Sequence, residues 1–109
     1  MPYSRAVAAG LLAILTLGAR SADQTFAGTI SDSMCAMDHT SMRMGPTDAE
    51  CTQACIEEHD ATYVLVDEKA VYKLSDQRAP KAFAGKKVKV VGTLDAATRT
   101  ITVTSITGA

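Results

Sequence analysis

One window of the chain, from Met34 to His59, holds nearly all of its sulfur and imidazole chemistry. All three cysteines and both histidines lie in this window, and so does every methionine except the first residue. These residues are Met34, Cys35, Met37, His39, Met42, Met44, Cys51, Cys55 and His59. Thiols, thioethers and imidazoles bind soft metals, and thiols also form disulfides. The pattern indicates that the rest of the chain is a scaffold for this window.

The first 21 residues are typical of a cleavable export signal. Arg5 supplies a short positive segment, residues 6–19 are mostly apolar, and Ala19-Arg20-Ser21 offers small residues at a cleavage site. The apolar run is too short and too small-sided for a membrane span, which needs about 20 apolar residues. We therefore expect residues 1–21 to be a signal peptide and residues 22–109 to be one periplasmic or secreted domain. An uncleaved anchor helix is the alternative.

The charge of residues 22–109 does not suggest nucleic-acid binding. Two of the 11 basic residues, Arg5 and Arg20, lie in the expected signal peptide, which leaves 9 basic against 12 acidic side chains. Seven of the remaining basic residues lie in residues 69–89, but few aromatic side chains that could stack on bases accompany them. We interpret these basic residues as a solvated face. A domain this small has a thin core, which a disulfide or a metal would help to stabilise.

Short β-rich segments separated by turn residues predict five strands. The segments are residues 24–31, 62–67, 70–75, 87–94 and 99–107. In the last segment the alternation of apolar and polar residues breaks at Ile106, which predicts a bulge or a strand end nearby.

A helix is predicted between the first two strands. Thr47-Asp48-Ala49-Glu50 matches the capping box that starts many helices, and Pro46 precedes it. We therefore expect a helix over residues 48–59. Cys51 and Cys55 are four residues apart and lie on the same face of such a helix. One further helical turn is expected near residues 81–83.

These elements predict an α+β fold that is mainly β. Short antiparallel strands with glycine bends favour a small barrel, and a five-stranded OB-like barrel is the first choice. The predicted helix departs from the usual OB order, because it lies between strands one and two rather than between strands three and four. A small α+β roll is the alternative.

Four segments carry a family resemblance: TFAGTISDSMC, ECTQAC, TYVLVDEKAVYKL and FAGKKVKVVGTLDAATRTITVTSI. They are similar to a family of small exported bacterial domains of unknown function, and the resemblance covers nearly all of residues 25–107. It implies an OB-like fold and a pattern that contains Cys35, His39, Cys51 and Cys55. His59 stands where the family often has a small residue. The resemblance implies no activity.

The same four residues suit a metal site. Cys35 and His39 are presented by one short segment, and Cys51 and Cys55 by the helix. Three thiolates and one imidazole form a common tetrahedral zinc environment, and soft sulfur ligands also select Cu(I). We predict a zinc or copper ion bound by these residues. The nearby methionines are better explained without a role as ligands: Met34 and Met37 suit gaps in the core, whereas Met42 and Met44 flank Arg43 in a polar stretch that suits core packing less.

A disulfide is the competing prediction, because cysteines outside the cytoplasm usually oxidise. A bond from Cys35 to either helix cysteine would tie the first strand to the helix. A bond between Cys51 and Cys55 would span one helical turn, where the required geometry is met poorly.

Three other polar residues of the window have ordinary explanations. His59 in the last helical turn interacts favourably with the helix dipole. Asp32 and Asp38 are candidates to orient His39, although such residues more often cap turns.

The sequence contains no pattern that predicts catalysis. The redox motif C-x-x-C, glycine-rich phosphate loops, H-E-x-x-H and serine-based elbows are all absent from it. We therefore expect a non-enzymatic exported domain whose partner is a metal ion. The alternative is a disulfide-stapled structural or interaction module without a metal.

Overall fold

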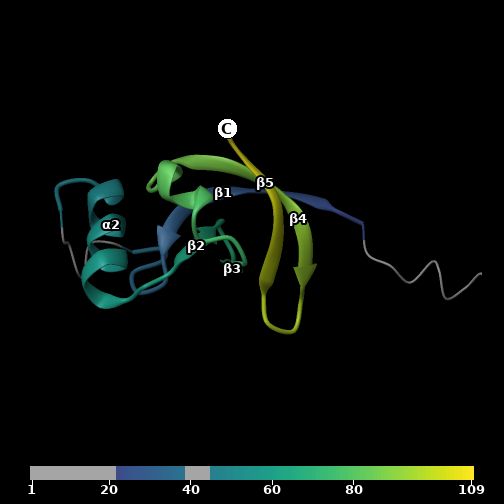
Figure 1. Cartoon of the computed structure of the whole chain (residues 1–109), viewed down its shortest axis with the longest axis horizontal. Coiled ribbons are helices and arrows are strands. Elements are labelled where there is room, and N and C mark those ends of the chain that lie inside the picture. Colours follow the sequence, from purple (N-terminus) through teal and green to yellow (C-terminus); the bar gives the residue numbers. More distant parts are fainter. Residues whose placement is uncertain (1–21, 39–44) are drawn as a thin grey trace, which may run out of the picture.

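The computed structural model describes residues 22–38 and 45–109. The elements, in chain order, are β1 (Gln24–Asp32), the α-helix α2 (Asp48–His59), β2 (Tyr63–Val66), β3 (Val71–Leu74), the 3-10 helix η2 (Ala79–Phe83), β4 (Lys87–Asp95) and β5 (Thr100–Gly108) (Figure 1). Each predicted strand and the predicted α-helix are confirmed, with boundaries within one residue. The expected signal peptide lies outside the described residues. Within the part that is described, no helix has the length and apolar character needed to cross a membrane.

All five strands belong to one sheet, in the order β1-β2-β3-β5-β4, and this order closes on itself because β4 also pairs with β1. Strand β1 pairs with two strands: residues 24–29 pair with β4, and residues 29–32 pair with β2. The pairs are antiparallel except for the short parallel contact between β3 and β5. The predicted α+β, mainly β class is therefore confirmed for residues 22–38 and 45–109, which form one five-stranded sheet and one α-helix.

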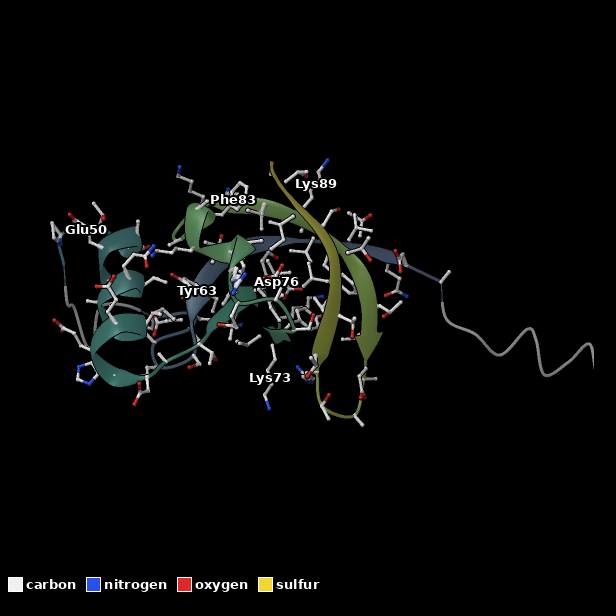
Figure 2. The ribbon with its side chains drawn as sticks, in the orientation of Figure 1. Glu50, Tyr63, Lys73, Asp76, Phe83 and Lys89 are labelled. Carbon is white, nitrogen blue, oxygen red and sulfur yellow. The ribbon has the colours of Figure 1, made fainter. Side chains whose placement is uncertain are left out.

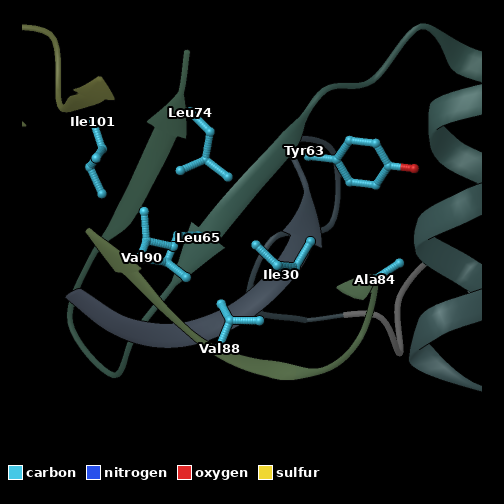
Figure 3. Close-up of a cluster of buried hydrophobic side chains, with 8 residues drawn as sticks. All are labelled: Ile30, Tyr63, Leu65, Leu74, Ala84, Val88, Val90 and Ile101. Atoms are coloured by element: carbon cyan, nitrogen blue, oxygen red, sulfur yellow. The ribbon is translucent and has the colours of Figure 1, made fainter. Parts of the chain in front are cut away.

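Alternating side chains fill the inside of the sheet. In β4, Val88 and Val90 are fully buried, whereas Lys87 and Lys89 are exposed. The core cluster gathers apolar side chains from every strand and from the segment after η2 (Figure 3): Ile30, Tyr63, Leu65, Leu74, Ala84, Val88, Val90 and Ile101. Figure 2 shows Lys73 and Lys89 pointing away from the sheet. Both lysines are exposed, as expected for solvated basic residues, but they point to opposite sides of the sheet in this view rather than forming one face.

Strand β5 contains the bulge that its sequence predicts. Val91 pairs with Ser105 and Gly92 pairs with Val103, so Thr104 is an extra residue on β5. The extra residue changes which face the following side chains occupy. Ile106 consequently packs against the core although it breaks the alternation that precedes it.

Aspartates cap the turns that follow the first four strands. One carboxylate oxygen of each aspartate accepts hydrogen bonds from the backbone N–H groups two and three residues further along the chain. These aspartates are Asp32, Asp67, Asp76 and Asp95. For Asp32 this confirms the turn-capping interpretation made from the sequence.

Helix α2 lies at one end of the sheet, beside β1 and β2 (Figure 1). The hydroxyl of Tyr63 points toward the helix (Figure 3) and donates to Gln53 Oε1 at 2.7 Å, and Gln53 Nε2 donates to the carbonyl of Lys81 at 3.1 Å. The start of the helix rests on Gly85, which has a left-handed φ of 75°. A Cβ at this position would lie 2.7 Å from the backbone nitrogen of Ala49. The helix is thus fixed to the scaffold at both its middle and its start.

Candidate metal centre

Cys35 is carried by a compact turn that directly follows β1. Asp32 is fully buried, and its Oδ2 accepts from the backbone N–H groups of Met34 at 3.0 Å and of Cys35 at 2.9 Å. Ala36 has a left-handed φ of 47° and donates its N–H to the carbonyl of Asp32 at 2.8 Å. Ser31 Oγ donates to the carbonyl of Ala36 at 2.7 Å. Together these hydrogen bonds fix the position of Cys35 relative to the end of β1.

The other two cysteines are carried by α2, which begins where the capping box predicts. Thr47 is the N-cap, and its side chain accepts from the backbone N–H of Glu50 at 3.1 Å. Glu50 itself lies on the outer side of the helix (Figure 2). The buried residues of the helix are Cys51, Thr52 and Cys55, so both thiols lie on the face that packs on the scaffold.

The turn and the helix bring the three sulfurs together. The Sγ atoms of Cys35, Cys51 and Cys55 all lie within 4.8 Å of one another. In a tetrahedral zinc site with Zn–S bonds of about 2.3 Å, the sulfurs are about 3.8 Å apart, so small shifts would accommodate an ion. Cys51 and Cys55 are fully buried and Cys35 is half-buried. No disulfide joins the cysteines, and all three belong to the described residues.

The surroundings of the sulfurs disfavour their charged form. Burial, the negative charge of Asp32 and hydrogen bonds with Asp32 and Cys35 raise the pKa of the Cys55 thiol to about 12. Burial and the charge of Asp32 also raise the pKa of Cys35, while a hydrogen bond with Cys55 opposes that shift. A thiol with a raised pKa is protonated at neutral pH and is a poor nucleophile. A bound cation would offset the cost of ionising these thiols and would release their protons.

Asp32 has a larger part in the site than the sequence indicates. Its side chain hydrogen-bonds with the Cys55 thiol in addition to the turn that carries Cys35. An aspartate directly after a β-rich segment is a recognisable signal for a capped turn. The contact with the helix depends on tertiary structure, so the local sequence gives no sign of it.

The remaining candidates from the window have different outcomes. His39, the predicted fourth ligand, lies outside the described residues, as do Met42 and Met44. Met34 and Met37 are 45% and 52% exposed, so the prediction that they fill gaps in the core is wrong.

His59 lies in the last turn of α2, where the sequence places it. Its side chain is exposed, whereas the cysteines of the same helix are buried. Among the described residues, the group of side chains that lie close enough together to hold a metal does not include His59.

The model of a family described as proteins of unknown function, DUF5818, matches residues 55–109, which is half of the chain. The chain belongs to this family. The DUF5818 match covers β2 to β5 and begins at Cys55, so Cys35 and Cys51 precede it. The family match therefore covers four of the five strands but only one of the three cysteines. No curated protein and no solved structure matches the chain significantly.

Proposed function

We propose that the chain is an exported, non-enzymatic domain that binds a zinc or copper ion through Cys35, Cys51 and Cys55. The observation that carries the proposal is the convergence of three sulfurs within 4.8 Å of one another, from two separate segments. In this proposal His39 is the fourth ligand, because it follows Cys35 by four residues on the same segment. Three thiolates and an imidazole would give zinc its usual tetrahedral set.

The burial of the cluster supports an ion rather than a catalytic thiol. Catalytic cysteines are ionised by neighbouring positive groups, whereas the acidic Asp32 raises the pKa of Cys35 and Cys55. A cation bound by the thiolates would also tie the turn after β1 to α2. Such a tie suits a domain with a small core, since binding energy in structural metal sites contributes to folding.

The proposal includes an OB-like scaffold and export. The closed strand order and the single parallel contact between β3 and β5 support a Greek-key barrel of the OB type. In addition, η2 lies between β3 and β4, where OB domains have their main helix. Residues 1–21 have the pattern of a signal peptide, which supports a periplasmic or secreted location.

A disulfide-stapled module without a metal is the second candidate. It is favoured by the same proximity of the sulfurs, because Cys35 lies near both helix cysteines and exported thiols commonly oxidise. A bond from Cys35 to one of them would close a loop of roughly 16–20 residues and leave one thiol. Such a bond would also tie β1 to α2, so stability alone does not distinguish the candidates.

Metal content and thiol count separate the two candidates. The protein would be expressed with its own leader, purified from the periplasm or medium without reductant or chelator, and analysed for bound metals. We expect about one zinc or copper ion per chain, and three reactive thiols once the protein is denatured with chelator. A metal-free protein with one reactive thiol would contradict the proposal and support the disulfide. A Cys35→Ser variant is the matched control, because it should lose the ion.

A further inference from the structure

Asp32 connects the two segments that supply the cysteines. Its Oδ2 accepts the backbone N–H groups of Met34 and Cys35, at 3.0 and 2.9 Å, and so closes the turn. Its side chain also hydrogen-bonds with the thiol of Cys55 on α2. The residue is fully buried, although carboxylates are rarely buried without specific partners. The bond with Cys55 needs the thiol proton and so belongs to the metal-free protein, whereas the two bonds to the turn remain when an ion binds.

We propose that Asp32 is a positioning residue of the metal centre: it holds the turn so that Cys35 Sγ faces the sulfurs of Cys51 and Cys55. This inference rests on the proposed metal-binding function. Asp32 does not bind the ion in this account. Its role is to supply an acceptor at the point where the turn must bend back toward the helix.

The expected consequence of losing this acceptor follows from the geometry of the turn. Without the carboxylate, the N–H groups of Met34 and Cys35 lose their partner, and the half-buried Cys35 can turn toward water. The two helix cysteines stay in place, because the cap at Thr47, the bond from Gln53 to Lys81 and the contact of Ala49 with Gly85 hold α2 without Asp32. The ion would then keep two thiolates and lose the third. Residues that orient metal ligands typically contribute 10–100-fold to affinity.

Asp67 provides a matched control on the same scaffold. Its Oδ1 accepts from the backbone N–H groups of Lys69 and Ala70, both at 2.7 Å, with the same spacing along the chain as in the Asp32 turn. Asp67 follows β2 and is not among the groups that shift the pKa of Cys35 or Cys55. Substituting Asp67 therefore removes an equivalent turn cap without touching the cysteines.

The test uses Co²⁺ as the probe, bound to the whole chain under reducing conditions, because thiolate-to-cobalt absorption reports the number of thiolates. We expect Asp32→Ala to weaken Co²⁺ binding by about 10–100-fold and to lower the thiolate band to that of Cys35→Ser. Asp32→Asn keeps an oxygen acceptor for the two N–H groups, so the intensity of its thiolate band should stay at the wild-type level. Asp67→Ala should leave affinity and band intensity unchanged.

A double variant shows whether Asp32 acts through Cys35. If it does, Asp32→Ala in the Cys35→Ser background should cause little further loss of Co²⁺ affinity, because the ligand that it positions is already absent. Additive losses would overturn the proposal. Equal losses in Asp32→Ala and Asp67→Ala would also overturn it, because the effect would then be that of any lost turn cap.

Two remaining outcomes are also decisive. If Asp32→Ala does not fold, Asp32→Gly takes its place, since glycine also lacks a side-chain acceptor for the two N–H groups. Wild-type affinity and a full thiolate band in a folded Asp32→Gly variant would reject the positioning role. A wild-type protein that binds no Co²⁺ through its thiolates would reject the metal site itself and the inference with it, and no variant would be needed to see this.

Discussion

The three cysteines of the cluster differ in ways that determine what each can do. Cys51 and Cys55 are fully buried on one helix face, whereas Cys35 is half-buried on a turn. An ion or an oxidant arriving from solvent would therefore meet Cys35 first. Loss of Cys35 should have the same effect on stability in either candidate function, so a second residue is needed to tell them apart.

Paired variants of Cys35 and His39 supply that distinction. We expect zinc at about 100 times its dissociation constant to stabilise the wild type by about 3 kcal/mol. Cys35→Ser and His39→Ala should each lose most of this gain, because each removes a ligand. Thermal melts with and without chelator measure it. If His39→Ala melts like wild type and Cys35→Ser does not, a disulfide is the better account. If both melt like wild type, the window does not stabilise the fold.

The raised thiol pKa values predict how metal binding depends on pH. The pKa of Cys55 is raised from 9.0 to about 12, so this thiol is protonated throughout the neutral range and must lose its proton when an ion binds. Zinc affinity should therefore rise with pH, by about tenfold per pH unit for each proton released, and fall in acid. Competition titrations with a chromophoric chelator at several pH values between 6 and 8 would measure this. An affinity that does not change with pH would mean that the thiols are not the ligands.

At the scale of elements, the sequence predicts the local structure well because each boundary has a local cause. The capping box marks the start of α2, aspartates mark the turns, and alternation marks the strands. The broken alternation at Ile106 also predicts the bulge in β5. The sheet order could not be predicted in this way, since the pairs β1–β4 and β3–β5 join segments far apart in the chain. The convergence of a turn and a helix at the cysteines could be anticipated only from the types of their side chains.

A glycine substitution tests the contact between α2 and the segment after η2. Gly85→Ala should destabilise the fold by about 1–3 kcal/mol, because alanine is strained at a left-handed φ and its Cβ would collide with the backbone of Ala49. Gly108→Ala is the matched control, since the nearest atom to its Cβ would be 3.9 Å away on Phe83. Urea denaturation measures both. Equal stability of the two variants would show that this contact does not hold the helix in place.

At the scale of the whole molecule, the closed sheet and the cysteine window are held by different forces. Strands β4 and β5 pair with each other along most of their length and contribute Val88, Val90 and Ile101 to the core cluster, which includes none of the cysteines. The turn after β1 has no side chain in the core cluster. The order of this turn depends on the hydrogen bonds of Asp32 and its neighbours. In the two candidate functions it also depends on the metal ion or the disulfide that would join Cys35 to α2. The two parts should therefore respond differently to a metal.

Hydrogen exchange with and without zinc tests this division. In the presence of saturating zinc, amides of residues 33–38 and of α2 should exchange more slowly, because the ion ties the turn to the helix. Amides of β4 and β5 that exchange through local opening should change little, since such opening does not break a metal bond. Only their slowest amides, which exchange through unfolding of the whole domain, should share the gain in stability. Cys35→Ser should show no zinc-dependent protection anywhere. Uniform slowing across the sheet would instead mean that the domain opens as one unit, and that the cysteine window is as much a part of its core as the strands are.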